Sequence, residues 1–251
     1  MILPGFVDLH THAPQFNHIC LGIDYTLLDW LAHYTFPEEQ HFSRPDYAAA
    51  VYSAFVDTLA ACGTTRCALF ATIHKDTCQL LLQLLQQKGI GAFLGKVCMD
   101  TNAPDYLLED THTALQDVET MLAAWPDNPL VKPIITPRFA PTSSRALLHG
   151  LGRLALKYQL PVQSHLAETT SELQWVAELF PECSSYADVY DTYHLFGDTP
   201  TLMAHCIHLK EKEIRTMCDK KVFAVHCPDS NLNLASGLMP ARQLLEAGVP
   251  L

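Results

Sequence analysis

Two histidines that could bind a metal ion close the first apolar run of the chain. His10 and His12 are separated by one residue, and the run spans residues 6–12. Because side chains alternate between the two faces of a strand, His10 and His12 would share one face with Asp8. Two imidazoles in this arrangement can bind one ion, although an H-x-H pair by itself is a weak signal of a metal site.

Further histidines close three later apolar runs. His165, His205 and His226 each end a strand-like stretch, and Glu168 follows His165 after two residues. Any one of these histidines alone is well explained as a hydrogen-bonded core residue. Because the carboxyl ends of barrel strands meet at one rim, histidines at four strand ends together predict a metal site. Neutral imidazoles suit zinc, and they also suit iron or nickel.

Glu168 supplies a carboxylate beside this predicted site. Bound zinc lowers the pKa of its water ligand to about 7. A nearby carboxylate can take the proton of that water and pass it to a leaving amine. Without the histidines, Glu168 would be interpreted as an acidic residue favoured at the start of a helix.

The elements that must position these residues alternate between short apolar runs and amphipathic stretches. We expect strands at residues 6–12, 64–70, 92–99, 131–136, 161–165, 201–205 and 222–226, and helices near residues 45–62, 76–87, 111–125, 143–158, 170–179, 186–196, 211–220 and 240–247. This alternation predicts an α/β fold with parallel strands and right-handed crossovers. Seven units and the opening of another strand at Val249 favour a (β/α)₈ TIM-type barrel. A doubly wound sheet would need a glycine-rich loop after the first strand, where this chain has His-Thr-His.

Composition excludes several classes of protein. Hydrophobic residues make up 49% of the 251 residues and charged residues 17%, which is typical of a folded domain with a large core. No apolar run is long enough to span a membrane, and the chain does not open with a signal peptide. The net charge of −11 argues against a nucleic-acid partner; it fits a small neutral or cationic substrate, or solubility alone. The nine cysteines form no C-x-x-C pair, which argues against a cysteine zinc site and favours a reduced, cytoplasmic location.

Several motifs resemble one enzyme superfamily. The segment Pro4–His12 resembles the opening strand of the amidohydrolases, and His165-x-x-Glu168, His205 and Asn231 resemble the branch that deaminates nitrogen heterocycles. Closer matches to the guanine deaminases within that superfamily are Leu28–Leu31, Tyr34–Pro37, Gly95–Asp100, Thr136–Phe139, Val189–Asp191 and His226–Leu232.

The resemblance implies a role for each candidate residue. His10, His12 and His165 would bind one zinc ion, with His205 beside the metal and Glu168 as the proton shuttle; Gln15 would hydrogen-bond the purine, Arg138 its carbonyl oxygen, and Phe139 would pack on the ring. The reaction would be hydrolysis of guanine to xanthine and ammonia, in purine catabolism, by a homodimer. Independently, a planar ring with polar edges calls for an aromatic face and a few aimed donors such as an arginine fork.

The chain also departs from the family pattern. Residues 1–251 would form one barrel domain that stops at Leu251, as the eighth strand begins. The aspartate expected at the end of that strand and the small β-sandwich domain are both missing. We therefore expect an incomplete barrel, and we hypothesise that this chain is inactive while a longer parent is active.

Two rival interpretations stay open. The first is a hydrolase or deaminase of another amine-bearing heterocycle, against which Gln15, Arg138 and Phe139 argue. The second is a catalytically dead scaffold, which the missing aspartate favours and the retained histidines and Glu168 oppose. The other zinc deaminase fold is excluded because neither its H-x-E nor its P-C-x-x-C motif occurs.

Overall fold

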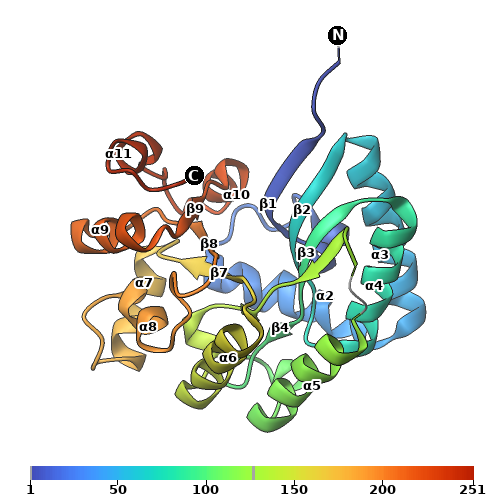
Figure 1. Ribbon diagram of the computed structural model, residues 1–251, viewed down its shortest axis with the longest axis horizontal. Helices are drawn as coiled ribbons and strands as arrows, with labels where there is room; N and C mark the ends of the chain where they lie inside the picture. Colours follow the sequence, from blue (N-terminus) through green and yellow to red (C-terminus); the bar gives the residue numbers. More distant parts are fainter. Residues whose placement is uncertain (1, 126–127) are drawn as a thin grey trace.

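Parallel strands follow one another in chain order around the centre of the molecule, with helices outside them (Figure 1). A computed structural model describes residues 2–125 and 128–251. Its strands are β1 (Phe6–His12), β2 (Thr64–Phe70), β3 (Gly91–Gly95), β4 (Val97–Cys98), β5 (Val131–Pro133), β6 (Thr136–Pro137), β7 (Val162–Leu166), β8 (Thr201–His205) and β9 (Phe223–Val225).

The strand pairing follows the predicted barrel order. The ladders run β1-β2-β3-β5, β4-β6 and β7-β8-β9, and every pairing is parallel. A parallel bridge between Ile135 and Val162 joins the first half to the second. Beyond β9, Ala224 donates its N–H to the carbonyl of Pro250 at 2.9 Å, so the residues after the last helix lie where an eighth strand was expected to begin. The α/β barrel prediction is confirmed.

The helices connect and cover these strands. They are α1 (Leu27–Trp30), α2 (Phe36–Gln40), α3 (Pro45–Ala61), α4 (Lys75–Lys88), α5 (Thr111–Ala124), α6 (Arg145–Tyr158), α7 (Thr170–Leu179), α8 (Tyr186–Thr192), α9 (Glu211–Lys220), α10 (Pro228–Asn233) and α11 (Ala241–Glu246). Segments of 3-10 or π-helix are η1 (Ala13–His18), η2 (Leu31–Thr35), η3 (His41–Ser43), η4 (Asp105–Leu107) and η5 (Ala140–Thr142).

Local signals in the sequence explain where most helices begin and end. Pro45 opens α3, where its missing N–H costs nothing. Gly89 ends α4 with a φ of 76°, a left-handed conformation that glycine adopts without steric cost. Thr169 and Glu172 form a reciprocal capping box at the start of α7.

Prolines interrupt one of the predicted strands. The expected strand at residues 131–136 divides into β5, which ends at Pro133, and β6, which contains Pro137. A proline has no N–H to contribute to a ladder, so continuous pairing stops there. The helical turns between residues 13 and 43, and helix α10, were not predicted.

The motif at Gly95–Asp100 has a structural role. The carboxylate of Asp100 accepts hydrogen bonds from the N–H of Ser144 at 2.6 Å, from the Ser144 hydroxyl at 2.5 Å and from the Thr111 hydroxyl at 2.6 Å. These contacts fix the starts of α5 and α6 relative to the loop after β4.

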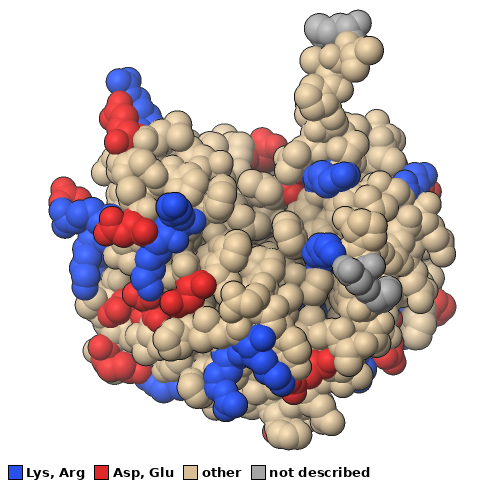
Figure 2. Space-filling model, in the orientation of Figure 1, with Lys and Arg blue, Asp and Glu red and all other residues tan. Residues whose placement is uncertain are grey.

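Charged side chains of both signs are distributed over the surface of the described residues. Figure 2 shows Lys and Arg side chains interspersed with Asp and Glu, mostly around the rim of the face in view. All nine cysteines are free thiols. No helix within residues 2–125 and 128–251 has the length and apolar character needed to span a bilayer.

Candidate metal and active site

Four histidines from three strands converge at the carboxyl ends of the barrel strands. His10 and His12 come from β1, His165 from β7 and His205 from β8. The His10 ring centroid lies 5.0 Å from that of His12, 4.8 Å from that of His165 and 5.2 Å from that of His205. The predicted convergence of these four side chains is therefore present.

A local irregularity in β1 helps to aim its two histidines. The pairing with β2 shifts register between Asp8 and Thr11, as in a β-bulge, and the Asp8 carboxylate accepts the N–H of His10 at 3.0 Å. Bulges re-aim side chains near functional sites. Phe70, which the sequence analysis missed, ends β2 and stacks on the His12 ring at 4.4 Å, so it forms a floor under the histidines.

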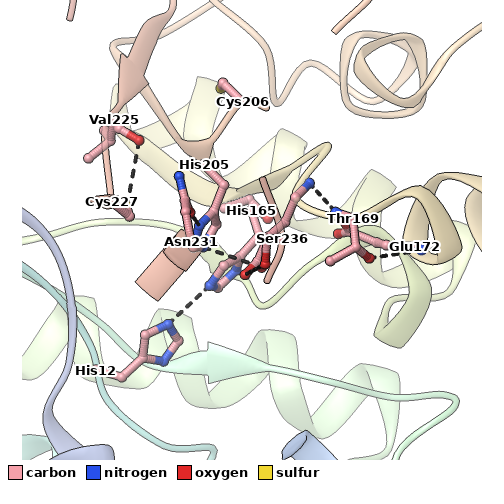
Figure 3. A network of polar contacts seen from close by, with 12 residues as sticks. His12, His165, Thr169, Glu172, His205, Cys206, Val225, Cys227, Asn231 and Ser236 are labelled. Atoms are coloured by element: carbon pink, nitrogen blue, oxygen red, sulfur yellow. Dashed lines mark hydrogen bonds and ion pairs between the residues drawn. The ribbon is translucent and has the colours of Figure 1, made fainter. Parts of the chain in front are cut away.

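Neighbouring carbonyl groups orient two of the imidazoles. Nδ1 of His165 donates to the carbonyl of Arg138 at 2.5 Å. Nδ1 of His205 donates to the side-chain oxygen of Asn231 at 2.8 Å (Figure 3). Since Nδ1 carries the proton in both rings, each Nε2 has its lone pair available, which is how such partners prepare histidines for a metal.

The donor set fits a divalent metal ion. One ring nitrogen each from His10, His165 and His205 lie within 4.8 Å of one another. Nε2 of His12 lies 3.0 Å from Nε2 of His165, close to the separation of about 3.3 Å between two nitrogens on tetrahedral zinc. Burial, as the largest cause, lowers the pKa of all four imidazoles, which keeps them neutral and able to bind a metal.

Glu168 lies beside this cluster, on the loop between β7 and α7. Its carboxylate is buried, with Oε2 at 3.4 Å from Nε2 of His205 and Oε1 accepting the Ser236 hydroxyl at 3.3 Å. Burial raises the pKa of Glu168 to about 8. The N–H of Glu168 donates to Glu172 at 2.8 Å, so the capping box of α7 also holds the backbone of Glu168.

One cavity of about 210 Å³ contains every predicted site residue. Its polar lining includes His10, His12, Gln15, Arg138, His165, Glu168 and His205, and its apolar lining includes Phe16, Leu27, Trp30, Leu31, Phe55 and Phe139. Gln15 reaches the cavity from η1, and Phe139 from the loop after β6. The cavity therefore brings the histidine cluster and Glu168 together with aromatic and aliphatic side chains.

Arg138 forms a buried ion pair with an acidic residue that the sequence analysis did not identify. Its Nη1 contacts both carboxylate oxygens of Glu39 at 2.8 Å, and the two side chains are 2% and 0% exposed. The guanidinium carbon also lies 5.2 Å from the ring centre of Phe36. The sequence analysis missed Glu39. Like Leu31, Thr35 and Phe36, which precede it, Glu39 is buried, and a buried acidic residue needs a partner.

The prediction that His226 joins the other histidines is wrong. Strand β9 ends one residue earlier, at Val225, and the His226 side chain is exposed. It lines a separate depression between β1 and β9. Asn231, five residues later, is the member of that motif that reaches the site, through its contact with His205.

The comparison with known families agrees with this architecture. The amidohydrolase family model matches residues 1–251, and the chain belongs to the amidohydrolase family. Members of this family generally use a divalent metal ion, as the donor set here also indicates.

Individual relatives narrow the comparison. The chain is 42% identical over 254 residues to a guanine deaminase of Dictyostelium discoideum, covering 100% of the chain and 56% of that relative. It matches the crystal structure of a guanine deaminase from C. acetobutylicum with bound guanine at a TM-score of 0.98 and 49% identity, covering 99% of the chain and 59% of that protein. An adenosine deaminase from Xanthomonas campestris with bound zinc matches at a TM-score of 0.85 and 26% identity, covering 98% of the chain and 54% of that protein. The chain spans about half the length of the curated relatives it matches.

Proposed function

We propose that the protein hydrolyses guanine to xanthine and ammonia. The observation that carries this proposal is that Gln15, Arg138 and Phe139 line the same cavity as the four histidines and Glu168. A metal site alone would serve many hydrolases, whereas a metal site facing an aromatic ring and aimed polar groups suits a flat heterocycle. The likeness to guanine deaminases over the whole chain supports the same substrate.

His10, His12 and His165 would hold one zinc ion, with His205 alongside. When bound, zinc would supply a water that ionises near neutral pH. The lowered pKa values of the histidines support this assignment, because only neutral imidazoles have a lone pair for a metal. The Arg138 carbonyl and Asn231 would keep His165 and His205 in the required orientation.

Glu168 would carry protons between the water and the leaving amine. Its buried position and its contact with His205 support this role, since a carboxyl with a pKa near neutrality can both accept and donate a proton. Phe139 would cover one face of the purine, while Gln15 and Arg138 would bind its polar edge.

The test measures guanine loss and xanthine formation by ultraviolet absorbance with zinc-loaded protein. Glu168→Gln should lower kcat by about 10²- to 10⁴-fold while zinc content is retained. Glu178→Gln is the matched control, because Glu178 lies exposed on α7. If the 251-residue chain leaves guanine untouched, a longer chain that contains it is assayed. Failure of that longer chain as well refutes the substrate assignment, and a panel of other amine-bearing heterocycles comes next. Homodimer formation stays a prediction from the resemblance, and a cytoplasmic location stays a prediction from the cysteine pattern.

A further inference from the structure

The ion pair between Glu39 and Arg138 uses only part of the guanidinium. Both carboxylate oxygens of Glu39 contact the same nitrogen, Nη1. A guanidinium has five N–H groups, two on each Nη and one on Nε. The geometry therefore leaves the three N–H groups of Nη2 and Nε outside the ion pair, on a residue that lines the cavity.

Two side chains of helix α2 contact the guanidinium of Arg138. Glu39 binds its edge, and Phe36, three residues earlier on the same helix, lies over it at 5.2 Å. At the other end of the residue, the Arg138 carbonyl accepts from Nδ1 of His165 at 2.5 Å and from the Ser164 hydroxyl at 3.2 Å. Arg138 is thus held at both its backbone and its side chain.

Glu39 also balances charge in the cavity. Arg138 lies close enough to the histidines for its positive charge to disfavour their protonation. A divalent ion among those histidines would add further positive charge. A buried guanidinium beside such a cluster is costly without a counter-charge, and the fully buried carboxylate of Glu39 supplies one.

We infer that Glu39 is a specificity-determining positioning residue, which holds Arg138 so that its remaining N–H groups bind the carbonyl oxygen of an oxopurine. The inference rests on the proposed function, because it takes a purine carbonyl as the ligand of Arg138. A residue needed only for folding would affect all purines alike, whereas Glu39 should affect those that carry this oxygen.

The test compares hypoxanthine with unsubstituted purine, which lacks the oxygen at carbon 6. Dissociation constants are measured by calorimetry with zinc-loaded protein, so that the result does not depend on turnover. The wild-type protein should bind hypoxanthine more tightly, and Glu39→Gln should reduce that preference by about 10-fold or more. Glu38→Gln, which changes the neighbouring acid outside the ion pair, should leave the preference unchanged.

Two further variants guard against a folding defect. Glu39→Asp keeps the charge but withdraws the carboxylate by one methylene, and should give an intermediate preference. In the background of Arg138→Gln, which removes the proposed donor, Glu39→Gln should cause no additional loss. An unchanged hypoxanthine preference in both folded Glu39 variants, or an equal loss of binding for both ligands, would overturn the inference. Failure of both this chain and a longer chain that contains it to consume guanine would count against the proposed function instead.

Discussion

Tyr190 joins the strand that carries His165 to the loop that carries Phe139. Its hydroxyl donates to the carbonyl of His165 at 2.9 Å and accepts the N–H of Ala140, the residue after Phe139, at 3.0 Å. It also lies 2.9 Å from the hydroxyl of Ser164. Tyr190→Phe removes these contacts without changing the ring that fills the core, so it tests the hydroxyl alone.

The expected cost follows from the groups that the variant leaves unpaired. Ala140 is fully buried, and its N–H would lose its partner. One orphaned buried donor costs about 1–3 kcal/mol, and loss of the contact with the His165 carbonyl adds about 1 kcal/mol. We therefore expect unfolding free energy to fall by about 2–4 kcal/mol. Because small displacements of positioning groups lower rates strongly, kcat/KM for guanine should fall by about 10- to 100-fold.

Urea unfolding measures the stability change, and steady-state guanine hydrolysis measures the catalytic change. Tyr193→Phe serves as the control, because Tyr193 follows the same helix and is only partly buried. Folded Tyr190→Phe protein with wild-type stability and wild-type kcat/KM would refute the idea that this hydroxyl couples the two parts of the site.

Three other outcomes are expected. Asn231→Ala should weaken zinc affinity or activity by about 10- to 100-fold, because His205 loses the acceptor that orients it. Asn233→Ala, at an exposed position on the same helix, should change neither. Equal zinc affinities of the two variants in a competitive titration would contradict this role of Asn231. Asp100→Ala should lower unfolding free energy by about 2–3 kcal/mol, through loss of its contacts to Ser144 and Thr111, with exposed Asp105→Ala as the control in urea unfolding. Removing the metal with a chelator should lower the thermal midpoint, and zinc at 100 times its dissociation constant should restore about 2.7 kcal/mol; an unchanged midpoint would show that the histidines bind no ion.

Regular patterns predicted most of the fold. The strands at residues 64–70 and 201–205 and the helices at residues 170–179 and 211–220 have the predicted bounds. Gly63 directly precedes the first of these strands, and Thr169 caps the first of these helices. The segment between residues 13 and 43 was not predicted. Its helical backbone changes between the 3-10, α and π types every few residues, so no single period runs through it.

The sequence predicted those residues of the candidate site that lie at the ends of strands. His165 and His205 could be located in this way, whereas His226 could not, because its orientation depends on a strand that ends one residue sooner. Glu39 lies 99 residues before Arg138, and only the folded chain brings the two together. A single sequence gives little information about long-range contacts of this kind. Here the one indication is an acidic residue on an otherwise apolar face of a helix.

The carbonyl of Arg138 serves both the metal-binding strand and the ring-binding loop, since it accepts from His165 and from Ser164. Altering the backbone of this loop to admit a different ring would therefore also disturb a histidine of the metal cluster. Gln15 reaches the same cavity from η1, a segment outside the loop after β6. Attempts to fit other heterocycles into this cavity should accordingly begin with variation at Gln15 and keep the loop after β6 intact.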